Sequence, residues 1–198
     1  GYSENPALIA NNFIILGGSS DAHGMRITSS DYQKIVHNNV LITSTDAGGG
    51  RALHIYYSDE LEIYNNIFAN NGGGYAIYSD GGGDFGESDY NNFYVTGTTM
   101  GHWGNDDKAD LGEWQSSTGG DLNSYAVDPQ FVSDSNLHVS NITLDGNAMS
   151  LSEISTDFDG QTRNPSGSDI GADEFTTLTA DAGIIGLTEP VSPFSAGE

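Results

Sequence analysis

Two stretches, Ile35-Val-His-Asn-Asn-Val-Leu-Ile42 and Ile63-Tyr-Asn-Asn-Ile-Phe-Ala69, repeat one pattern in which a pair of asparagines stands between apolar residues. The pair occurs four times, at Asn11-Asn12, Asn38-Asn39, Asn65-Asn66 and Asn91-Asn92. The intervals are 27, 27 and 26 residues. Self-similarity at a near-fixed period of about 20 to 50 residues is typical of repeat architectures, so the pairs predict a fold of stacked, similar units.

The residues around each pair follow the pattern of a β-strand. When the copies are aligned on the pair, the position directly after it is apolar in all four: Phe13, Val40, Ile67 and Phe93. The position two residues further on is also apolar, and the position between them varies, as in a strand with one buried face. A second strand pattern ends in an isoleucine at residues 23–27, 51–55 and 73–77. Each repeat is therefore predicted to hold at least two short strands.

Stacking of such repeats determines the predicted fold. One repeat cannot bury its apolar face alone, whereas copies stacked at an inter-strand distance of about 4.8 Å share one continuous core. We predict an all-β fold, a right-handed parallel β-helix (solenoid) of about four to six coils with an irregular C-terminal cap. Asparagine tolerates the left-handed backbone region and can form coil-to-coil ladders, so all eight paired asparagines are expected to be structural.

The composition restricts the classes of function. The chain has 198 residues, no cysteine, and 28 acidic against 5 basic residues, which gives a net charge of -23. Without cysteine there is no disulfide or thiolate chemistry, and no run of apolar residues is long enough to predict membrane insertion. A surface this acidic repels nucleic acid, so we expect no nucleic-acid partner. Carboxylate oxygens suit Ca²⁺, so bound calcium is compatible with the sequence, although the fold requires no cofactor.

After the fourth asparagine pair the repeat gives way to an excursion over residues 96–120, in which Asp110 is placed to cap a short helix. Four motifs follow in order: Glu113-Trp-Gln115, Asp128-Pro-Gln-Phe131, Asp159-Gly-Gln-Thr-Arg163 and Asp169-Ile-Gly-Ala-Asp-Glu-Phe175. Together with the asparagine repeat, this set resembles the C-terminal coil and cap of right-handed parallel β-helix proteins of the pectate-lyase-like group, especially the repeat regions of large secreted bacterial surface proteins and adhesins.

The resemblance implies more about architecture than about chemistry. It implies a secreted, extracellular or cell-surface location, and a buried or half-buried ion pair between Asp159 and Arg163 in the closing coil. It implies that residues 1–176 are the C-terminal part of a longer solenoid, and that residues 177–198 are a linker and the start of an immunoglobulin-like module. Neighbouring domains of the same long chain are then expected partners.

One predicted function is a structural or carbohydrate-binding segment of a cell-surface adhesin. Stacking the second strand pattern on Ile27, Ile55 and Ile77 places Arg26 beside His54 and makes an outward row of Thr28, Tyr56 and Tyr78. Tyrosine rings in such a row can stack on sugar rings, which favours an extracellular polysaccharide or other surface glycan as partner. The predicted ligand-binding residues are Arg26, His54, Tyr56, Tyr78 and Trp103.

The alternative is a polysaccharide lyase or glycoside hydrolase that acts on an extracellular polysaccharide. Such enzymes need a carboxylate pair, or a base assisted by calcium and a cationic side chain. The candidate catalytic residues near strand ends are Asp59, Asp80, Asp84 and Arg51. None of the five histidines has a neighbour at His-x-x-x-His spacing, so no metal ligands are assigned and a zinc site would require residues from several coils.

Overall fold

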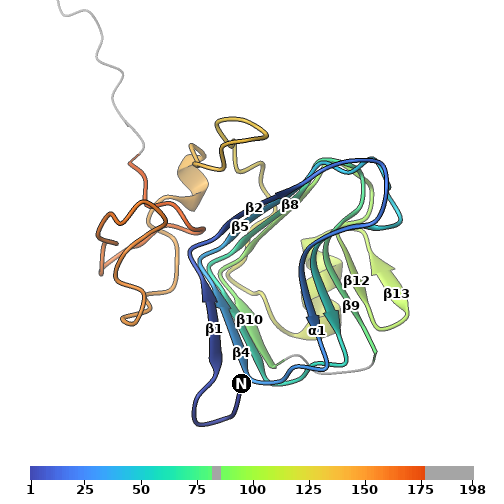
Figure 1. The fold of residues 1–198 in the computed structure, drawn as a ribbon, viewed down its shortest axis with the longest axis horizontal. Coiled ribbons are helices and arrows are strands. Elements are labelled where there is room, and N and C mark those ends of the chain that lie inside the picture. The colour runs from blue at the N-terminus through green and yellow to red at the C-terminus, as the bar shows by residue number, and fades with distance from the viewer. Residues whose placement is uncertain (82–85, 177–198) are drawn as a thin grey trace, which may run out of the picture.

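The protein is a parallel β-solenoid of about four turns in the computed structural model, which describes residues 1–81 and 86–176 (Figure 1). The all-β prediction is confirmed, and helix in the described chain is confined to α1 (Leu111–Thr118) and the 3₁₀ helix η1 (Ile142–Leu144). Each turn adds one strand to each of three sheets, where the sequence predicted at least two strands per repeat. The predicted module at residues 177–198 lies outside the described residues.

Each sheet is named here by its first strand. The β1 sheet contains β1 (Ala7–Ala10), β4 (Gln33–Val36), β7 (Leu61–Tyr64) and β10 (Gly86–Asp89). The β2 sheet contains β2 (Phe13–Leu16), β5 (Asn39–Ile42), β8 (Ile67–Asn70) and β11 (Asn92–Val95). The β3 sheet contains β3 (Ala22–Thr28), β6 (Gly50–Tyr56), β9 (Tyr75–Asp80) and β12 (Gly101–Trp103), with β13 (Asp106–Lys108) antiparallel to β12.

Stacked apolar side chains fill the interior of the solenoid. Val40, Phe68 and Phe93 lie in register on adjacent strands of the β2 sheet and are fully buried. Leu53 and Ile77, in register on the β3 sheet, belong to the same core cluster. Burial of a side chain of this size contributes roughly 1.5–3 kcal/mol, so stacking supplies the stabilisation that a single coil lacks.

One asparagine from each coil forms a hydrogen-bonded ladder at the corner between the β1 and β2 sheets. The Nδ2 atom of Asn12 donates to Oδ1 of Asn38 at 2.8 Å, and Asn38 donates in the same way to Asn66 at 2.9 Å. Asn66 then donates to Asn91 at 3.0 Å. The backbone N–H groups of Asn12, Asn38 and Asn66 donate to the same amide oxygens, so the ladder ties the corner of each coil to the next.

The ladder shows that alignment on the asparagine pairs is wrong by one residue in the second and fourth coils. Asn38 and Asn91 are the first members of their pairs, whereas Asn12 and Asn66 are the second members. The residue before each ladder asparagine has left-handed backbone geometry; these four are Asn11 (φ 55°), His37 (φ 51°), Asn65 (φ 59°) and Tyr90 (φ 56°). Asparagine therefore makes the turn in only two of the four coils.

The other four asparagines bond the C-terminal segment, defined here as residues 121–176, to the outside of the stack (Figure 1). Three of them bond this segment in the same way: the side-chain amide donates to a backbone carbonyl and accepts from a backbone N–H. These three are Asn39, Asn65 and Asn92. Their partners are Leu137 and Ala172 for Asn39, Met149 for Asn65, and Val127 for Asn92. These amides satisfy backbone groups of an irregular segment that has few partners of its own.

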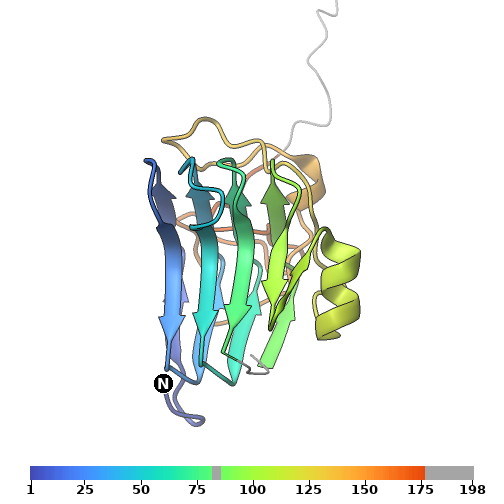
Figure 2. The same ribbon diagram turned by 90° about the vertical axis from the view of Figure 1, so that its right-hand side faces the viewer.

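Helix α1 covers one end of the solenoid (Figure 2). It begins as predicted, because the Asp110 side chain accepts from the Glu113 N–H at 2.9 Å. Its Trp114 is fully buried in the core cluster, and the indole N–H donates to Asp121 at 2.8 Å. Asp121 also accepts from the last ladder residue, Asn91, at 3.1 Å. Burial raises the pKa of Asp121, and the hydrogen bonds that its carboxylate accepts oppose this rise.

The predicted ion pair between Asp159 and Arg163 is wrong. Arg163 is buried and pairs with Glu174 at 3.4 Å, and it donates to the Asn11 side chain at 3.0 Å. The Asp159 carboxylate instead contacts His138. Arg163 thus closes the C-terminal segment onto the first coil, and desolvation by burial lowers its pKa although four surrounding carboxylates oppose the shift.

Replacement of Asn66 by alanine is expected to lower the free energy of unfolding by about 3 kcal/mol. The Asn38 backbone N–H loses its acceptor, the Ile35 and Tyr64 carbonyls lose a donor, and each buried group left unpaired costs about 1–3 kcal/mol. The exposed Asn71→Ala variant is the matched control, expected to change stability by less than about 0.5 kcal/mol. Urea titration of both variants measures the difference; equal losses would contradict a stabilising ladder.

Acid is expected to destabilise the fold through His37 before most carboxylates titrate. Its Nδ1 bonds to the Gly171 carbonyl at 3.0 Å and its Nε2 to the Asn65 amide at 3.0 Å, and burial, assisted by Arg163, lowers its pKa to about 3. Between pH 6.5 and that value the unfolded chain binds the extra proton, so stability falls as the pH is lowered. In denaturant titrations at pH 6.5 and 5.5, the loss of unfolding free energy should be smaller for His37→Gln than for the wild type by about 1 kcal/mol, because the unfolded histidine is already half protonated at pH 6.5. An equal loss of stability in the wild type and in His37→Gln would show that His37 does not cause the destabilisation by acid.

Candidate functional site

The outer face of the β3 sheet collects basic and aromatic side chains that stack from coil to coil; Figure 2 views this sheet from the outside. One row occupies the same register position on four adjacent strands: Arg26, His54, Tyr78 and His102. A second row contains His23, Arg51 and Tyr75, and a third contains Thr28, Tyr56 and Asp80. We call these three rows the basic aromatic face.

A local bend of the strands brings the first two rows together. Ala52 and Leu53 are consecutive residues of β6, and both are buried in the core cluster. Successive side chains of a regular strand point to opposite faces, so two adjacent inward residues interrupt the alternation. Arg51 and His54 flank them on the outside, and Arg51 Nη1 lies 3.3 Å from His54 Nδ1.

The rings on this face form one continuous series of contacts. His54 packs edge to face against His23 at 4.8 Å and against Tyr78 at 5.4 Å between ring centroids. Tyr78 stacks on His102 at 4.2 Å with an interplanar angle of 7°. The Arg51 guanidinium lies over the Tyr78 ring, 3.7 Å from its centroid, in a cation–π contact. The series therefore spans all four coils.

Each carboxylate on this face is bonded to its own histidine. His54 Nε2 lies 3.1 Å from Asp80 Oδ1, and His102 Nδ1 lies 2.6 Å from Oδ1 of Asp107 on β13. The Tyr75 hydroxyl donates to the same Asp107 carboxylate at 3.3 Å. Asp80 and Asp107 thus offset part of the positive charge next to this face, although both carboxylates stay partly exposed.

Burial lowers the pKa of His54; the Asp80 hydrogen bond opposes this shift and the Arg51 charge adds to it. Burial also lowers the pKa of His23, with further lowering by Arg51 and Arg26. Three buried side-chain nitrogens of the described residues lack a hydrogen-bond partner, and two of them, His23 Nε2 and Arg51 Nε, belong to this face. Buried nitrogens normally have a hydrogen-bond partner, so the hydrogen-bonding capacity of these two is unused.

The structure arranges the predicted ligand-binding residues differently from the row expected from the sequence. Tyr56 pairs with Asp80 and Tyr78 with His54, so Thr28, Tyr56 and Tyr78 do not form one row. Trp103 pairs with Ser79, packs against the core cluster and contacts Trp114 at 5.9 Å, so it does not join the rings of the basic aromatic face.

Of the candidate catalytic residues that the structure describes, Asp80 and Arg51 lie near one another and Asp59 lies apart from them. Asp80 lies in the face, bonded to His54 and near Arg51. Asp59 lies in the turn after β6, where its backbone N–H donates to Asp31. Asp84 lies outside the described residues. His54, the histidine nearest to Asp80, is itself buried.

Three members of the face were not among the predicted ligand-binding residues: His23, Tyr75 and His102. His23 and Tyr75 belong to strand patterns that were recognised, but their row lies beyond the bend. His102 lies in the excursion, on a strand too short to show a periodic pattern. With these residues included, the face holds three of the five histidines and two of the five lysine and arginine residues of a chain with net charge -23.

Other concave or ligand-like groups of the described residues lie elsewhere. A cleft of about 460 Å³ is lined partly by Glu87, Asp89 and Trp103. Within the described ranges, one group of histidine and carboxylate side chains is close enough to share a cation, and it consists of His138, Asp159 and Asp173. No described helix is long and apolar enough to cross a membrane.

The neighbours of His54 are expected to shift its pKa in opposite directions when they are replaced. Arg51→Gln removes a positive charge that opposes protonation, so the pKa of His54 should rise. Asp80→Asn removes the carboxylate that favours protonation, so it should fall. NMR titration of the imidazole resonances measures both shifts, and an unchanged pKa in both variants would contradict the geometry described.

Comparison of the chain with protein-family models, with curated proteins and with solved structures gave no match.

Proposed function

We propose that this chain is a carbohydrate-binding segment of a secreted cell-surface protein, similar in architecture to pectate-lyase-like β-helix proteins, and that it binds an extracellular glycan on the basic aromatic face. The observation that carries the proposal is the continuous ring series from His23 to His102, flanked by Arg26 and Arg51. Both faces of the Tyr78 ring are covered, by Arg51 and by His102, so a sugar would meet the exposed edges of the rings, and arginine and tyrosine would donate hydrogen bonds to its oxygens.

The repeat itself suits an extended ligand. Successive strands of a sheet lie about 4.8 Å apart, so each coil offers a similar set of ring and polar groups to successive units of a polymer. The protein elsewhere is strongly acidic, which makes this face the most favourable approach for a glycan with anionic groups.

The same geometry favours binding over catalysis. Asp80 and Asp107 each hold a hydrogen bond to a histidine, and the His54 ring is buried beneath its neighbours. A lyase or hydrolase needs acidic and basic groups that reach the substrate, and these groups are occupied by one another. Release of shorter products from a polysaccharide would be the test of the alternative function, a polysaccharide lyase or glycoside hydrolase.

Tyr78→Ala and Arg51→Gln are each expected to weaken glycan binding about tenfold, which corresponds to about 1.4 kcal/mol. Tyr2→Ala, which removes an exposed tyrosine outside the face, is the matched control and should bind as the wild type does. A glycan array with and without calcium identifies the ligand, and titration calorimetry measures the affinities.

Two outcomes would overturn the proposal. Absence of binding to every glycan, or equal binding by the Tyr78 and Tyr2 variants, would exclude this face as a glycan site. Release of shorter products from a polysaccharide would show catalysis, and the variants would then be compared by rate.

A further inference from the structure

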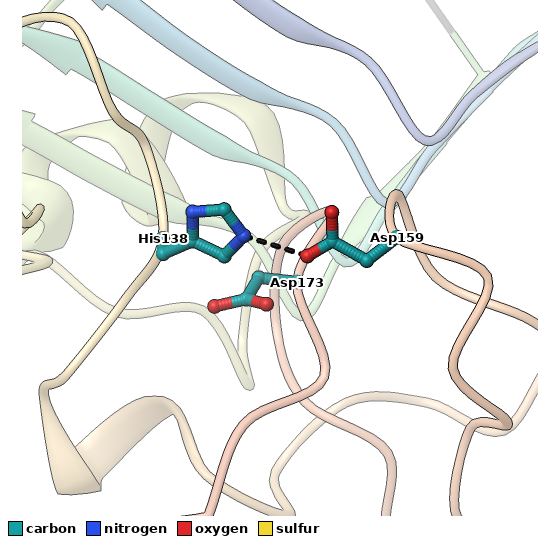
Figure 3. Close-up of side chains that lie close together, drawn as sticks. All are labelled: His138, Asp159 and Asp173. Atoms are coloured by element: carbon teal, nitrogen blue, oxygen red, sulfur yellow. Dashed lines mark hydrogen bonds and ion pairs between the residues drawn. The ribbon is translucent and has the colours of Figure 1, made fainter.

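Three side chains from separate loops of the C-terminal segment converge at one point: His138, Asp159 and Asp173 (Figure 3). One ligand atom from each lies within 4.8 Å of those from the other two. His138 Nε2 is 2.6 Å from Asp159 Oδ2. The group is separate from the basic aromatic face, and its members are 14 to 35 residues apart in sequence.

The orientation of the His138 ring is set by its other nitrogen. The Oδ1 atom of Asn136 accepts from the His138 backbone N–H at 3.2 Å and also contacts His138 Nδ1. An amide oxygen only accepts hydrogen bonds, so Nδ1 carries a proton, and loss of the second proton from Nε2 leaves a lone pair that faces the two carboxylates. This is the arrangement of metal-binding histidines, whose second nitrogen donates to an oxygen.

The charges of the group also favour a bound cation. A lone pair on Nε2 and an oxygen of Asp159 repel at 2.6 Å unless a proton or metal ion lies with them. A proton adds one positive charge against two carboxylates, of which Asp173 is buried. Burial raises the pKa of Asp173, and the charges of Asp157 and Asp159 contribute to this rise. A divalent ion would balance both carboxylates.

We propose that His138 Nε2, Asp159 and Asp173 bind a divalent transition-metal ion such as Zn²⁺, which replaces the proton between His138 and Asp159. Zinc takes one imidazole nitrogen and carboxylate oxygens at about 2.0–2.2 Å, with water as a fourth ligand. Calcium prefers six to eight oxygen ligands, and this group offers one nitrogen and two carboxylates. To bind the ion, the side chains of His138 and Asp159 must move apart, and the carboxylate of Asp173 must move closer to both.

The surroundings suit a site that fastens the C-terminal segment. The second carboxylate oxygen of Asp173 accepts from the Val139 N–H at 3.0 Å, which holds the carboxylate in place. Phe13 of β2 packs edge to face on His138 at 5.1 Å and stacks on Phe158 at 4.0 Å. The ion would therefore join three loops at a point that is packed on the first coil.

Calorimetric titration of the chelator-treated full chain with Zn²⁺ tests the proposal. We expect one ion per chain, an affinity that weakens as the pH falls because protons compete for Nε2, and a melting temperature that Zn²⁺ raises and Ca²⁺ leaves unchanged. Asp159→Asn and His138→Gln should each lower the affinity at least tenfold. Asp134→Asn, an exposed aspartate in the same segment, is the matched control.

Asp159 is exposed, so its variant is expected to fold; circular dichroism of the metal-free proteins verifies this. Absence of binding to the wild type would show that the group is only a histidine–carboxylate ion pair. Binding that Asp159→Asn and Asp134→Asn weaken equally, or that Ca²⁺ reproduces, would equally overturn the site.

Discussion

The asparagine ladder is the interaction on which the other features of the structure depend. Its four amides fix the corner at which each coil turns from the β1 sheet into the β2 sheet, and they do so with buried bonds that leave no alternative register. The ladder ends on Asp121, which also binds the Trp114 indole. The repeat and its end cap are therefore one polar network, and a buried network of this kind stabilises only when every member is satisfied.

The sequence was sufficient for the fold class because the repeat and the apolar positions are both periodic. Alignment on the asparagine pairs failed by one residue in two coils because β5 and β8 are buried on both faces, so no alternation marks the inside. Alignment on the isoleucines failed by two residues in the third coil, since the partner of Ile55 is Ser79 rather than Ile77. A shift of two residues keeps every side chain on its own face, so the hydrophobic pattern cannot reveal it.

Errors in the predicted register also explain why the candidate site was predicted only in part. Arg26 beside His54 followed correctly from the register of the first two coils, whereas the position of Tyr78 depended on the third. Trp103 was placed by its residue type, and its inward packing depends on Trp114, which only the folded excursion brings near. His138, Asp159 and Asp173 lie in loops without a periodic pattern, so their spacing in the sequence does not predict the distances between their side chains. Arg163 likewise pairs with Glu174 through the shape of such a loop.

The bond between Arg163 and Asn11 joins residues 152 positions apart, and Asn11 also donates to the carbonyl of Thr156. The first coil thus acquires its last partners only after nearly all of the described chain has been synthesised. Sheets of adjacent coils can pair over about 27 residues as they emerge, whereas closure of this long loop costs more entropy and is slower. We therefore expect the coils to pair one after another and the contacts of Asn11 with Arg163 and Thr156 to form last.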